Sequence, residues 1–404
     1  MRESLLKIGF IEKKVTESND FYIINSCTVT QKADTDTRNF INRFRKINPK
    51  SKIVVTGCYA ELEKDRSLLK NMGVDYLVRN KEKAKIAEII GQVSGVILKT
   101  ITDFKDKNRA FVKIQDGCNH RCSYCKVRIV RGPSKSRETS EILEEAASLI
   151  KRGFKEIVLT GICLGAWGRD LKKKDKLAIL LKRILKIEGD FRIRLSSIEP
   201  VYVTDDVIKV FKNDKKICKH LHIPLQSGDD KILKVMNRPY TTKNIERLVR
   251  SLRKHIPDIA ITTDVLVGFS GEDDKSFLRT QKFLEKIKPS RMHLFSYSAR
   301  EGTTAFKLKN GPAKDIVKKR VRTLDALGNK LSMDFAKRFI DKSEKIVVES
   351  SRDRKTGMLV GYTDRYIRVL TSGDDSIKNS LISVRIKTVD IQNRKILACL
   401  ECKE

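Results

Sequence analysis

Residues 116–125 read DGCNHRCSYC, and the three cysteines in this stretch decide the interpretation of the chain. Cys118, Cys122 and Cys125 have the spacing C-x3-C-x2-C. Three thiolates are one short of the four that close a structural zinc or iron–sulfur site. A [4Fe–4S] cluster on three thiolates keeps one iron open to bind a substrate, so the spacing predicts a catalytic cluster. The alternatives are half of a zinc site, or buried thiols that act as small hydrophobic side chains.

Composition is that of an ordinary globular protein. The chain has 404 residues, enough for two or three domains, and a hydrophobic fraction of 40%. No stretch reaches the roughly 18 consecutive apolar residues of a membrane helix, and the basic start lacks the apolar core of a signal peptide. We therefore expect a cytoplasmic protein without a membrane partner, whose nine cysteines serve metal binding or catalysis rather than disulfides.

Basic residues far outnumber acidic ones. There are 85 Lys and Arg against 51 Asp and Glu, which gives a formal net charge of +34. Such an excess is an electrostatic footprint for a polyanion, most simply nucleic acid. The alternative is a lysine-rich bias on solvated faces, because the excess is spread along the whole chain. Charge alone does not separate RNA from DNA.

The N-terminal part reads as a small α/β unit. Short apolar runs that alternate with helical patterns lie at residues 21–25, 53–56 and 75–78, and one helical pattern runs from about residue 34 to 47. Strands that alternate with helices predict a parallel sheet. Cys27 and Cys58 follow the first two strands. Ligands bind at that edge of a parallel sheet, so the two cysteines are candidates to share one metal centre.

The central part predicts an incomplete parallel barrel. Six β-like runs, each but the last followed by a helix-like segment, start near Ala110, Glu156, Phe191, His220, Ala260 and Arg291. One strand and one helix per interval are typical of an open relative of the eightfold barrel. Chemistry in such barrels lies at the carboxyl ends of the strands, and the three-cysteine stretch follows the first strand.

The C-terminal part predicts a small antiparallel barrel. Five short apolar runs, separated by Gly, Asp, Asn and Ser, lie at residues 346–348, 358–360, 366–370, 381–384 and 396–398. A basic helical stretch from about residue 314 to 337 is expected to be the linker to this barrel.

Polar motifs also follow the later strands of the central barrel. They are TGI (160–162), RLSSIEP (194–200), LQSG (225–228) and GFSGE (268–272). A glycine lets backbone groups approach a ligand closely, and hydroxyl and carboxylate groups suit ribose hydroxyls or an ammonium group. Each motif alone reads equally well as a turn or a helix cap. Their shared position past strand ends predicts a nucleoside cofactor.

Together these motifs resemble the radical SAM methylthiotransferase family, and most of all its members that make 2-methylthio-N6-threonylcarbamoyladenosine in tRNA. The resemblance covers nearly the whole chain and rests on VKIQDGC (112–118), LTGICLG (159–165), RIRLSSIEP (192–200), LHIPLQSG (221–228), MNR (236–238) and VLVGF (265–269). The TGI and LSSIEP runs favour this subfamily over the isopentenyladenosine branch.

The resemblance implies which residues bind the cofactors. The radical SAM [4Fe–4S] cluster would be held by three thiolates, those of Cys118, Cys122 and Cys125. S-adenosylmethionine (SAM) would lie with its adenine beside Tyr124 and its methionine amine near Gly161. Ser197 and Glu199 would approach the other polar atoms of SAM, with Gln226 nearby.

The resemblance extends to the N-terminal cysteines. NSCTVT (25–30) and VTGCY (55–59) match two cysteine motifs of the family's methylthiotransferase domain, which implies that Cys27 and Cys58 bind an auxiliary [4Fe–4S] cluster. The family's earlier cysteine would precede Met1, and two thiolates are poor support for a cubane cluster. We therefore expect that this start is internal or that the gene is truncated.

Two further segments bear on RNA. GYTDRYIRV (361–369) resembles the family's C-terminal TRAM domain, a small RNA-binding barrel. Basic and aromatic side chains on a β barrel suit phosphate contact and base stacking; the alternative is a purely structural barrel. KVR (126–128) departs from the family, whose members are usually apolar there with a proline. This departure predicts an altered cofactor pocket or an added RNA contact.

The predicted fold class is therefore α/β with three domains. A small parallel-sheet methylthiotransferase domain without its first strand and cysteine spans residues 1–98, a partial (β/α)6 radical SAM barrel spans 104–338, and an all-β TRAM barrel spans 341–404. The resemblance implies a transferase that converts N6-threonylcarbamoyladenosine in tRNA to its 2-methylthio derivative, using SAM and a sulfur donor.

The expected partners are the anticodon loop of tRNA, where unstacked bases are accessible, and an electron donor such as flavodoxin or ferredoxin. We expect a monomer. Two alternatives stay open. One is a sister methylthiotransferase that acts on isopentenyladenosine tRNA or on a ribosomal protein. The other is an iron–sulfur RNA-binding protein that is deficient in sulfur transfer.

Overall fold

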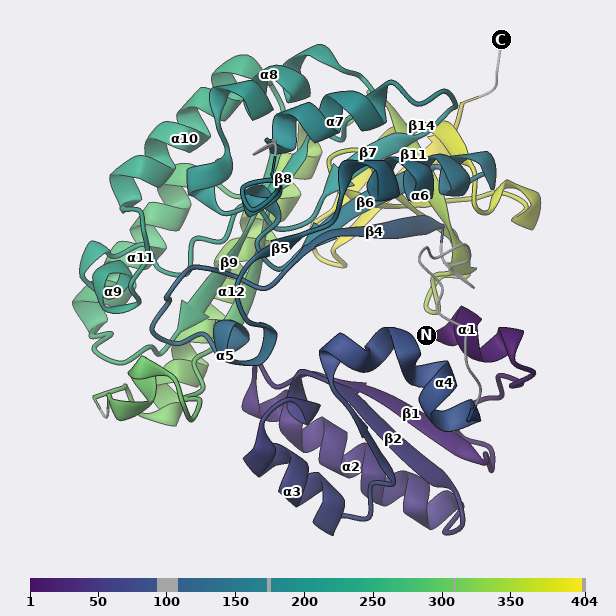
Figure 1. Cartoon of the computed structure of the whole chain (residues 1–404). Helices are drawn as coiled ribbons and strands as arrows, with labels where there is room; N and C mark the ends of the chain where they lie inside the picture. Colours follow the sequence, from purple (N-terminus) through teal and green to yellow (C-terminus); the bar gives the residue numbers. More distant parts are fainter. Residues whose placement is uncertain (93–107, 173–175, 309, 402–404) are drawn as a thin grey trace. The chain divides into compact units, whose positions relative to one another are not determined.

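The computed structural model describes residues 1–92, 108–172, 176–308 and 310–401 (Figure 1). They form two compact units. The first unit contains residues 1–92, 117–133 and 298–307, and the second contains the other described residues. The predicted boundary between the first two domains, at residues 98–104, lies outside the described residues.

The first unit is built on a three-stranded parallel sheet, as the sequence predicted. Its elements are α1 (Arg2–Lys7), β1 (Phe21–Ser26), α2 (Gln31–Ile47), β2 (Lys52–Gly57), α3 (Glu63–Asn71), β3 (Tyr76–Val78), α4 (Ile86–Gly91) and, from the three-cysteine segment, α5 (Val127–Arg131). α2 begins three residues earlier than predicted because the Thr30 hydroxyl accepts a hydrogen bond from the amide of Ala33 (3.2 Å) and caps the helix.

Alternating side chains give this sheet two buried faces. Tyr22 and Ile24 pack with residues of α2 and α3, including Ile41 and Leu69. The intervening strand residues contribute to a second core, formed with α1 and α4. Because helices cover both faces of this parallel sheet, apolar residues occupy successive strand positions, which explains their continuous apolar runs.

The second unit contains a partial parallel barrel. Its strands are β4 (Arg109–Asp116), β6 (Glu156–Gly161), β7 (Arg192–Leu195), β8 (His220–His222), β9 (Ala260–Val267) and β10 (Arg291–Ser296), with a short antiparallel β5 (Lys135–Ser136) beside β4. The pairs β4–β6–β7 and β8–β9–β10 are parallel, and isolated parallel bridges connect the two sheets. Strands begin within one residue of all six predicted starts.

Helices cover the outer side of these strands (Figure 1). They are α6 (Thr139–Lys151), α7 (Leu177–Leu185), α8 (Asp205–Asn213), α9 (Asp230–Val235), α10 (Thr242–His255), α11 (Asp274–Ile287) and α12 (Lys314–Lys337). α12 is more than the linker that the sequence indicated. Leu324, in its middle, packs into the core of the partial barrel, whereas Met333 and Ala336 pack into the core of the C-terminal barrel.

The C-terminal residues form a closed five-stranded barrel of β11 (Ser343–Arg352), β12 (Leu359–Thr363), β13 (Arg368–Thr371), β15 (Lys395–Leu400) and β14 (Leu381–Asp390), in that order. The prediction of a wholly antiparallel barrel was wrong for one pair of strands. β13 pairs with β15 in parallel, through Leu370–Leu397 and Thr371–Ala398. Closure removes the exposed strand edges that an open sheet would present.

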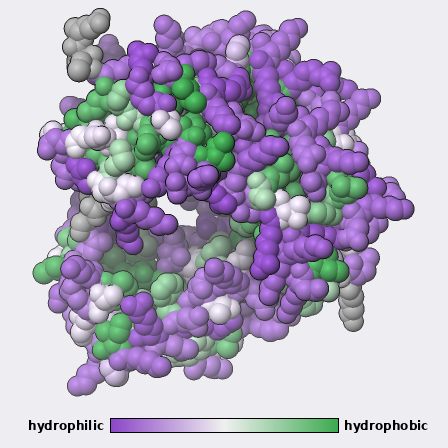
Figure 2. Space-filling view, turned by 180° about the vertical axis from the view of Figure 1, so that it is seen from behind, coloured by the Kyte–Doolittle hydropathy of each residue, from purple (hydrophilic) through white to green (hydrophobic). Residues whose placement is uncertain are grey.

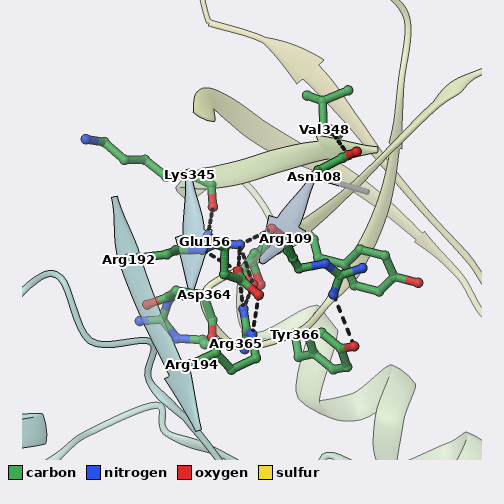
Figure 3. A network of polar contacts seen from close by, with 12 residues as sticks. Asn108, Arg109, Glu156, Arg192, Arg194, Lys345, Val348, Asp364, Arg365 and Tyr366 are labelled. Carbon is green, nitrogen blue, oxygen red and sulfur yellow. Dashed lines mark hydrogen bonds and ion pairs between the residues drawn. The ribbon is translucent and has the colours of Figure 1, made fainter. Parts of the chain in front are cut away.

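A buried polar network joins this barrel to the amino ends of the parallel strands (Figure 3). Glu156, the first residue of β6, accepts hydrogen bonds from Arg192 (2.6 Å) and Arg194 (2.8 Å), which belong to β7. The two guanidinium groups also donate to backbone carbonyls of the C-terminal barrel, those of Lys345, Tyr362, Thr363 and Asp364. Arg109 of β4 adds an ion pair with Glu349 (2.6 Å).

The charge state of Glu156 follows from this environment. Burial alone would raise its pKa, but the charges of Arg194 and Arg192 outweigh burial and lower the pKa to about 2. Since this value lies below the ordinary 4.5, the stabilisation is complete above about pH 4.5 and is lost as the pH falls towards 2. The carboxylate is therefore charged throughout the physiological range.

Hydrophilic side chains cover most of the face drawn in Figure 2, with smaller hydrophobic patches between them. This surface agrees with a charged fraction of 34%. Within the described residues, no helix combines the length and the apolar character that crossing a membrane requires.

Replacing Glu156 by Gln tests the network. We expect Glu156→Gln to lower the free energy of unfolding by about 3–5 kcal/mol, because two buried guanidinium groups lose their counter-charge. Urea unfolding followed by fluorescence of the single tryptophan, Trp167, reports on the core of this unit. Glu144→Gln, an exposed position on α6, is the matched control. Equal unfolding midpoints for the two variants would contradict the role assigned to Glu156.

Candidate iron–sulfur and cofactor sites

Cys27 and Cys58 lie at neighbouring ends of the sheet of the first unit. Ser26 and Gly57 are paired in the parallel register of β1 and β2, and each cysteine directly follows one of them. Cys27 is exposed, and its Sγ accepts a hydrogen bond from the amide of Val29 (3.4 Å). The sheet therefore places both thiols at one edge, where the sequence predicted a metal centre.

Gly57 makes this close approach possible. Its φ of +97° lies in the left-handed region, and a Cβ at this position would stand 2.1 Å from the carbonyl oxygen of Ser26. Any side chain would push β2 away from β1 at the residue before Cys58. The glycine thus fixes where the Cys58 thiol emerges from the sheet.

An arginine from the three-cysteine segment contacts the Cys58 thiol. Cys58 is 6% exposed, and its Sγ accepts a hydrogen bond from Nε of Arg131 (3.0 Å), the last residue of α5. The sequence assigned no role to Arg131, because only the fold brings a residue so far along the chain beside Cys58. The hydrogen bond fixes the position of the Cys58 sulfur relative to α5.

The three predicted cluster cysteines lie on one closed segment. Gly117 has a φ of +70°, and a Cβ there would stand 2.0 Å from the carbonyl oxygen of Pro133, at the other end of the segment. The amide of Cys118 donates to the carbonyl of Gly132 (3.1 Å), which ties the two ends together. Glycine is therefore required at this position of the DGC motif, because the two ends of the loop come together there.

Within the loop the thiols keep partial access to solvent. Cys118, Cys122 and Cys125 are all half-buried, and so is Tyr124, the predicted neighbour of the adenine. The amide of Cys125 donates to the carbonyl of Cys122 (3.1 Å), which makes a tight turn around Tyr124. Three thiols on one short loop, all reachable from outside, fit the ligand set of a cluster that keeps one iron open.

Two buried cations contact the N-terminal domain within the first unit, Lys126 from this loop and Arg300 from residues 298–307. That segment is tied to the loop by the amide of Ala305, which donates to the carbonyl of Ser123 (2.7 Å). Lys126, the residue after Cys125, is 5% exposed, and its Nζ lies 3.3 Å from Oδ2 of Asp65 and 3.5 Å from Oγ1 of Thr28. The guanidinium of Arg300 donates to the same Thr28 hydroxyl (3.0 Å). The departure at Lys126 from the family pattern is therefore matched by an ion pair with Asp65, and Lys126 is too buried to serve as a surface contact for RNA.

The remaining predicted cofactor residues lie at the carboxyl edge of the partial barrel, in the second unit. Gly161 ends β6, Ser197 follows β7, and Gln226 follows β8. Ser197 pairs with His222 and Gln226 with Val265 in isolated parallel bridges. Gln226 has a φ of +68°, in the left-handed region that non-glycine residues rarely occupy. Such backbone strain is concentrated at binding sites.

Gly161 and Glu199 each lie beside a side chain to which the sequence assigned no role. A Cβ on Gly161 would stand 3.1 Å from Oε1 of Gln115, which accepts a hydrogen bond from the amide of Cys163 (2.8 Å). Glu199 forms an ion pair with Arg238, whose Nε donates to the hydroxyl of Tyr240 (2.8 Å). The MNR motif (236–238) contains this arginine and was the available signal.

The described residues fit the two predicted clusters unequally. No three His, Cys, Asp or Glu side chains among them are arranged to hold a single metal ion. A cubane cluster is a different case, because each thiolate binds a separate iron, and the triad supplies three such ligands on one loop. At the N-terminal edge the described residues supply only Cys27 and Cys58, which do not complete a set of three.

Comparison with known proteins agrees with this arrangement. Residues 112–284 match the Radical SAM superfamily, and residues 1–79 match a family described as Uncharacterized protein family UPF0004. The chain is similar to a solved radical SAM methyltransferase, TsrM from Kitasatospora setae, with a TM-score of 0.52 over 69% of this chain and 64% of that one. At 14% identity this likeness concerns the fold alone.

Curated relatives are similar over nearly the whole length. The threonylcarbamoyladenosine tRNA methylthiotransferase MtaB of Thermotoga maritima is 36% identical, over 99% of this chain and 92% of the relative. MtaB of Bacillus subtilis is also 36% identical, over 94% and 88%. The tRNA-2-methylthio-N(6)-dimethylallyladenosine synthase of Carboxydothermus hydrogenoformans is 32% identical, over 95% and 91%.

The partial barrel and the three-cysteine loop together define a radical SAM protein. More narrowly, identity over nearly the full length shows that this chain belongs to the radical SAM methylthiotransferase family. The family resemblance predicted from the sequence is confirmed.

Gly57→Ala tests the edge that carries Cys27 and Cys58. Gly9→Ala is the control, because Gly9 has a similar φ of +88° but a Cβ there would meet no atom within 4 Å. We expect this control to lose only about 1–2 kcal/mol of stability, the cost of a positive φ for a residue with a side chain. Gly57→Ala should lose about 2 kcal/mol more, because its Cβ meets the Ser26 carbonyl. Hydrogen exchange of the β1 and β2 amides measures the difference. Equal protection in the two variants would contradict the steric argument.

Lys126→Met tests the fastening of the cysteine loop. The substitution keeps a long, unbranched side chain and removes the charge. We therefore expect the free energy of unfolding to fall by about 1–3 kcal/mol, because the Asp65 carboxylate loses its partner. Asp65→Asn in the same chain should recover much of that loss, a coupling that a double-mutant cycle in thermal unfolding would measure. Lys70→Met, on the exposed side of α3, is the control. Additive effects of the two substitutions would contradict the pairing.

Proposed function

We propose that this chain is a tRNA methylthiotransferase that converts N6-threonylcarbamoyladenosine beside the anticodon to its 2-methylthio derivative, using SAM and a sulfur donor. The observation that carries the proposal is the 36% identity to MtaB enzymes over nearly the full length. The intact triad of Cys118, Cys122 and Cys125 on its closed loop supports it.

The three-cysteine loop would bind the cluster and the adenine of SAM. Cys118, Cys122 and Cys125 would hold the radical SAM cluster. When bound, this [4Fe–4S] cluster supplies the electron that cleaves SAM reductively. Tyr124 lies in the turn between the last two cysteines, where it would flank the adenine.

At the carboxyl edge of the barrel, the remaining residues would bind SAM itself. Gly161 has no side chain to obstruct the methionine end. Ser197, Glu199 and Gln226 offer a hydroxyl, a carboxylate and an amide. Arg238 would orient the carboxylate of Glu199, because the two side chains form a largely buried ion pair.

The N-terminal cysteines would take part through an auxiliary cluster. Cys27 and Cys58 emerge at one sheet edge, and Arg131 contacts Cys58. The described residues supply two of the three thiolates that such a cluster would need.

We further propose the three-domain division at residues 1–98, 104–338 and 341–404, with a (β/α)6 barrel in the centre and a TRAM-type RNA-binding barrel at the C-terminus. The formal net charge of +34 supports RNA as the partner. A monomeric cytoplasmic enzyme, reduced by a flavodoxin or a ferredoxin, completes the proposal.

Mass spectrometry of tRNA nucleosides tests this function. In a strain that lacks the gene and has no second enzyme for this step, we expect 2-methylthio-N6-threonylcarbamoyladenosine to disappear. The wild-type gene should restore it, and Cys122→Ala should restore none, because the cluster loses a ligand. Cys399→Ala, an exposed cysteine of the C-terminal barrel, is the matched control and should restore the nucleoside in full.

Two results would contradict the proposal. One is unchanged 2-methylthio-N6-threonylcarbamoyladenosine in the deletion strain. The other is loss of the 2-methylthio derivative of isopentenyladenosine alone, which would assign the chain to the sister activity.

A further inference from the structure

A cavity of about 350 Å³ lies in the second unit, at the amino ends of the parallel strands. Its walls come from α12, from the beginning of β10, and from the C-terminal barrel. It is separate from the residues proposed to bind SAM, which lie at the carboxyl ends of the strands. A volume near the lower end of the range for ligand pockets, about 300–1,000 Å³, suits a single small polar group with its neighbours.

The cavity is rich in positive charge. Four arginines line it, against one carboxylate, that of Asp325. The four are Arg291, Arg365, Arg368 and Arg394. Asp325 accepts a hydrogen bond from the side chain of Asn329 (3.0 Å), another lining residue. The lining therefore carries a net positive charge.

The four arginines differ in how they are neutralised. Arg365 forms an ion pair with Glu344 (2.9 Å), and Arg368 forms one with Asp353 (2.7 Å). Arg291 and Arg394 form no ion pair with any residue of the described ranges. Two guanidinium groups without a protein anion, in one polar cavity, are a site for an anionic ligand. Arginine binds phosphate through paired N–H donors.

The walls are held in place before any ligand arrives. The Glu156 network ties the C-terminal barrel to the strands, and Arg109 donates a hydrogen bond to the hydroxyl of Tyr366 (3.1 Å), as Figure 3 shows. Tyr366 in turn stacks on Tyr362, with ring centroids 5.1 Å apart, and both tyrosines line the cavity. A preformed site loses less entropy when it binds.

Two lining residues have a strained backbone. Tyr366 has a φ of +63° and Arg394 a φ of +53°, both in the left-handed region. A non-glycine residue is held there only when its surroundings require it, and such residues are concentrated at functional sites. Arg394 is exposed and ends the turn between β14 and β15, which pairs Asp390 with Lys395 and holds the Arg394 backbone in this conformation.

The position of the cavity limits which part of a ligand reaches it. Thr262, near the start of β9, lines the cavity, and β9 ends at Val267. Five residues of extended strand between them span about 17 Å. An RNA whose reacting base lies at the carboxyl edge would therefore meet the cavity with a phosphate several nucleotides away.

We propose that this cavity binds a backbone phosphate of the substrate RNA, through Arg291 and Arg394, at a distance from the base that is modified. The inference rests on the proposed function, since it assumes a tRNA substrate. The amino end of the barrel would then select RNAs that are long enough to reach it, while the reaction takes place at the carboxyl end.

The test uses the full chain and two RNA probes, a full-length tRNA and a trinucleotide centred on the adenosine that is modified. For the full-length tRNA, we expect Arg291→Gln with Arg394→Gln to weaken binding about tenfold and to lower the slope of log K against log salt by about 1 to 2. The same variant should bind the trinucleotide as the wild type does, because this probe is too short to reach the cavity. Arg291→Lys with Arg394→Lys should recover much of the lost affinity, because the charges return.

Arg152→Gln with Arg247→Gln is the matched control. It removes two exposed charges from α10 and from the end of α6, and it should leave the affinity for both probes unchanged. Circular dichroism confirms that each variant is folded.

Three outcomes would overturn the inference. Full-length tRNA bound equally by the cavity variant and by the control would overturn the inference alone. An equal loss for the trinucleotide would place the contact beside the reacting base and contradict the assigned position. A wild-type chain that binds no tRNA would overturn the proposed function, and the inference with it.

Discussion

The buried carboxylate of Glu156 is the constraint on which the second unit depends. It neutralises Arg192 and Arg194, and these arginines donate to backbone carbonyls that belong to another domain of the sequence. An ion pair so buried contributes little net stability compared with apolar packing, but it is costly to break and specific in its geometry. It therefore fixes how the C-terminal barrel meets the strands. The arginine-lined cavity, whose walls come from both sides of that contact, depends on it for its geometry.

The two sets of cysteines depend on a different constraint, the close approach of backbones. Gly57 lets β1 and β2 end side by side, so that Cys27 and Cys58 emerge together. Gly117 lets the two ends of the loop that carries the triad come together. In both places a side chain would collide with a carbonyl oxygen, so glycine determines where the thiols are. Lys126 then ties the loop to Asp65 of α3 within the first unit.

Local patterns in the sequence predicted most of the fold. Apolar runs gave the starts of β4, β6, β7, β8, β9 and β10 to within one residue, because each of these strands contributes apolar side chains to the core of the partial barrel. Local motifs also singled out the candidate site residues, whose roles stay predictions. What escaped prediction is tertiary. The parallel pairing of β13 with β15, the ion pair of Lys126 with Asp65 and the contact of Arg131 with Cys58 join residues far apart in the chain, and no periodicity records them.

The central claim is that Cys118, Cys122 and Cys125 hold a catalytic iron–sulfur cluster. Counting iron and acid-labile sulfide after anaerobic reconstitution tests it most directly, with the wild type compared with a variant in which all three cysteines are alanine. The account predicts about four fewer irons per chain in the variant, because one [4Fe–4S] cluster is lost. Equal iron in the two proteins would contradict the claim and, with it, the assignment of radical chemistry to this loop.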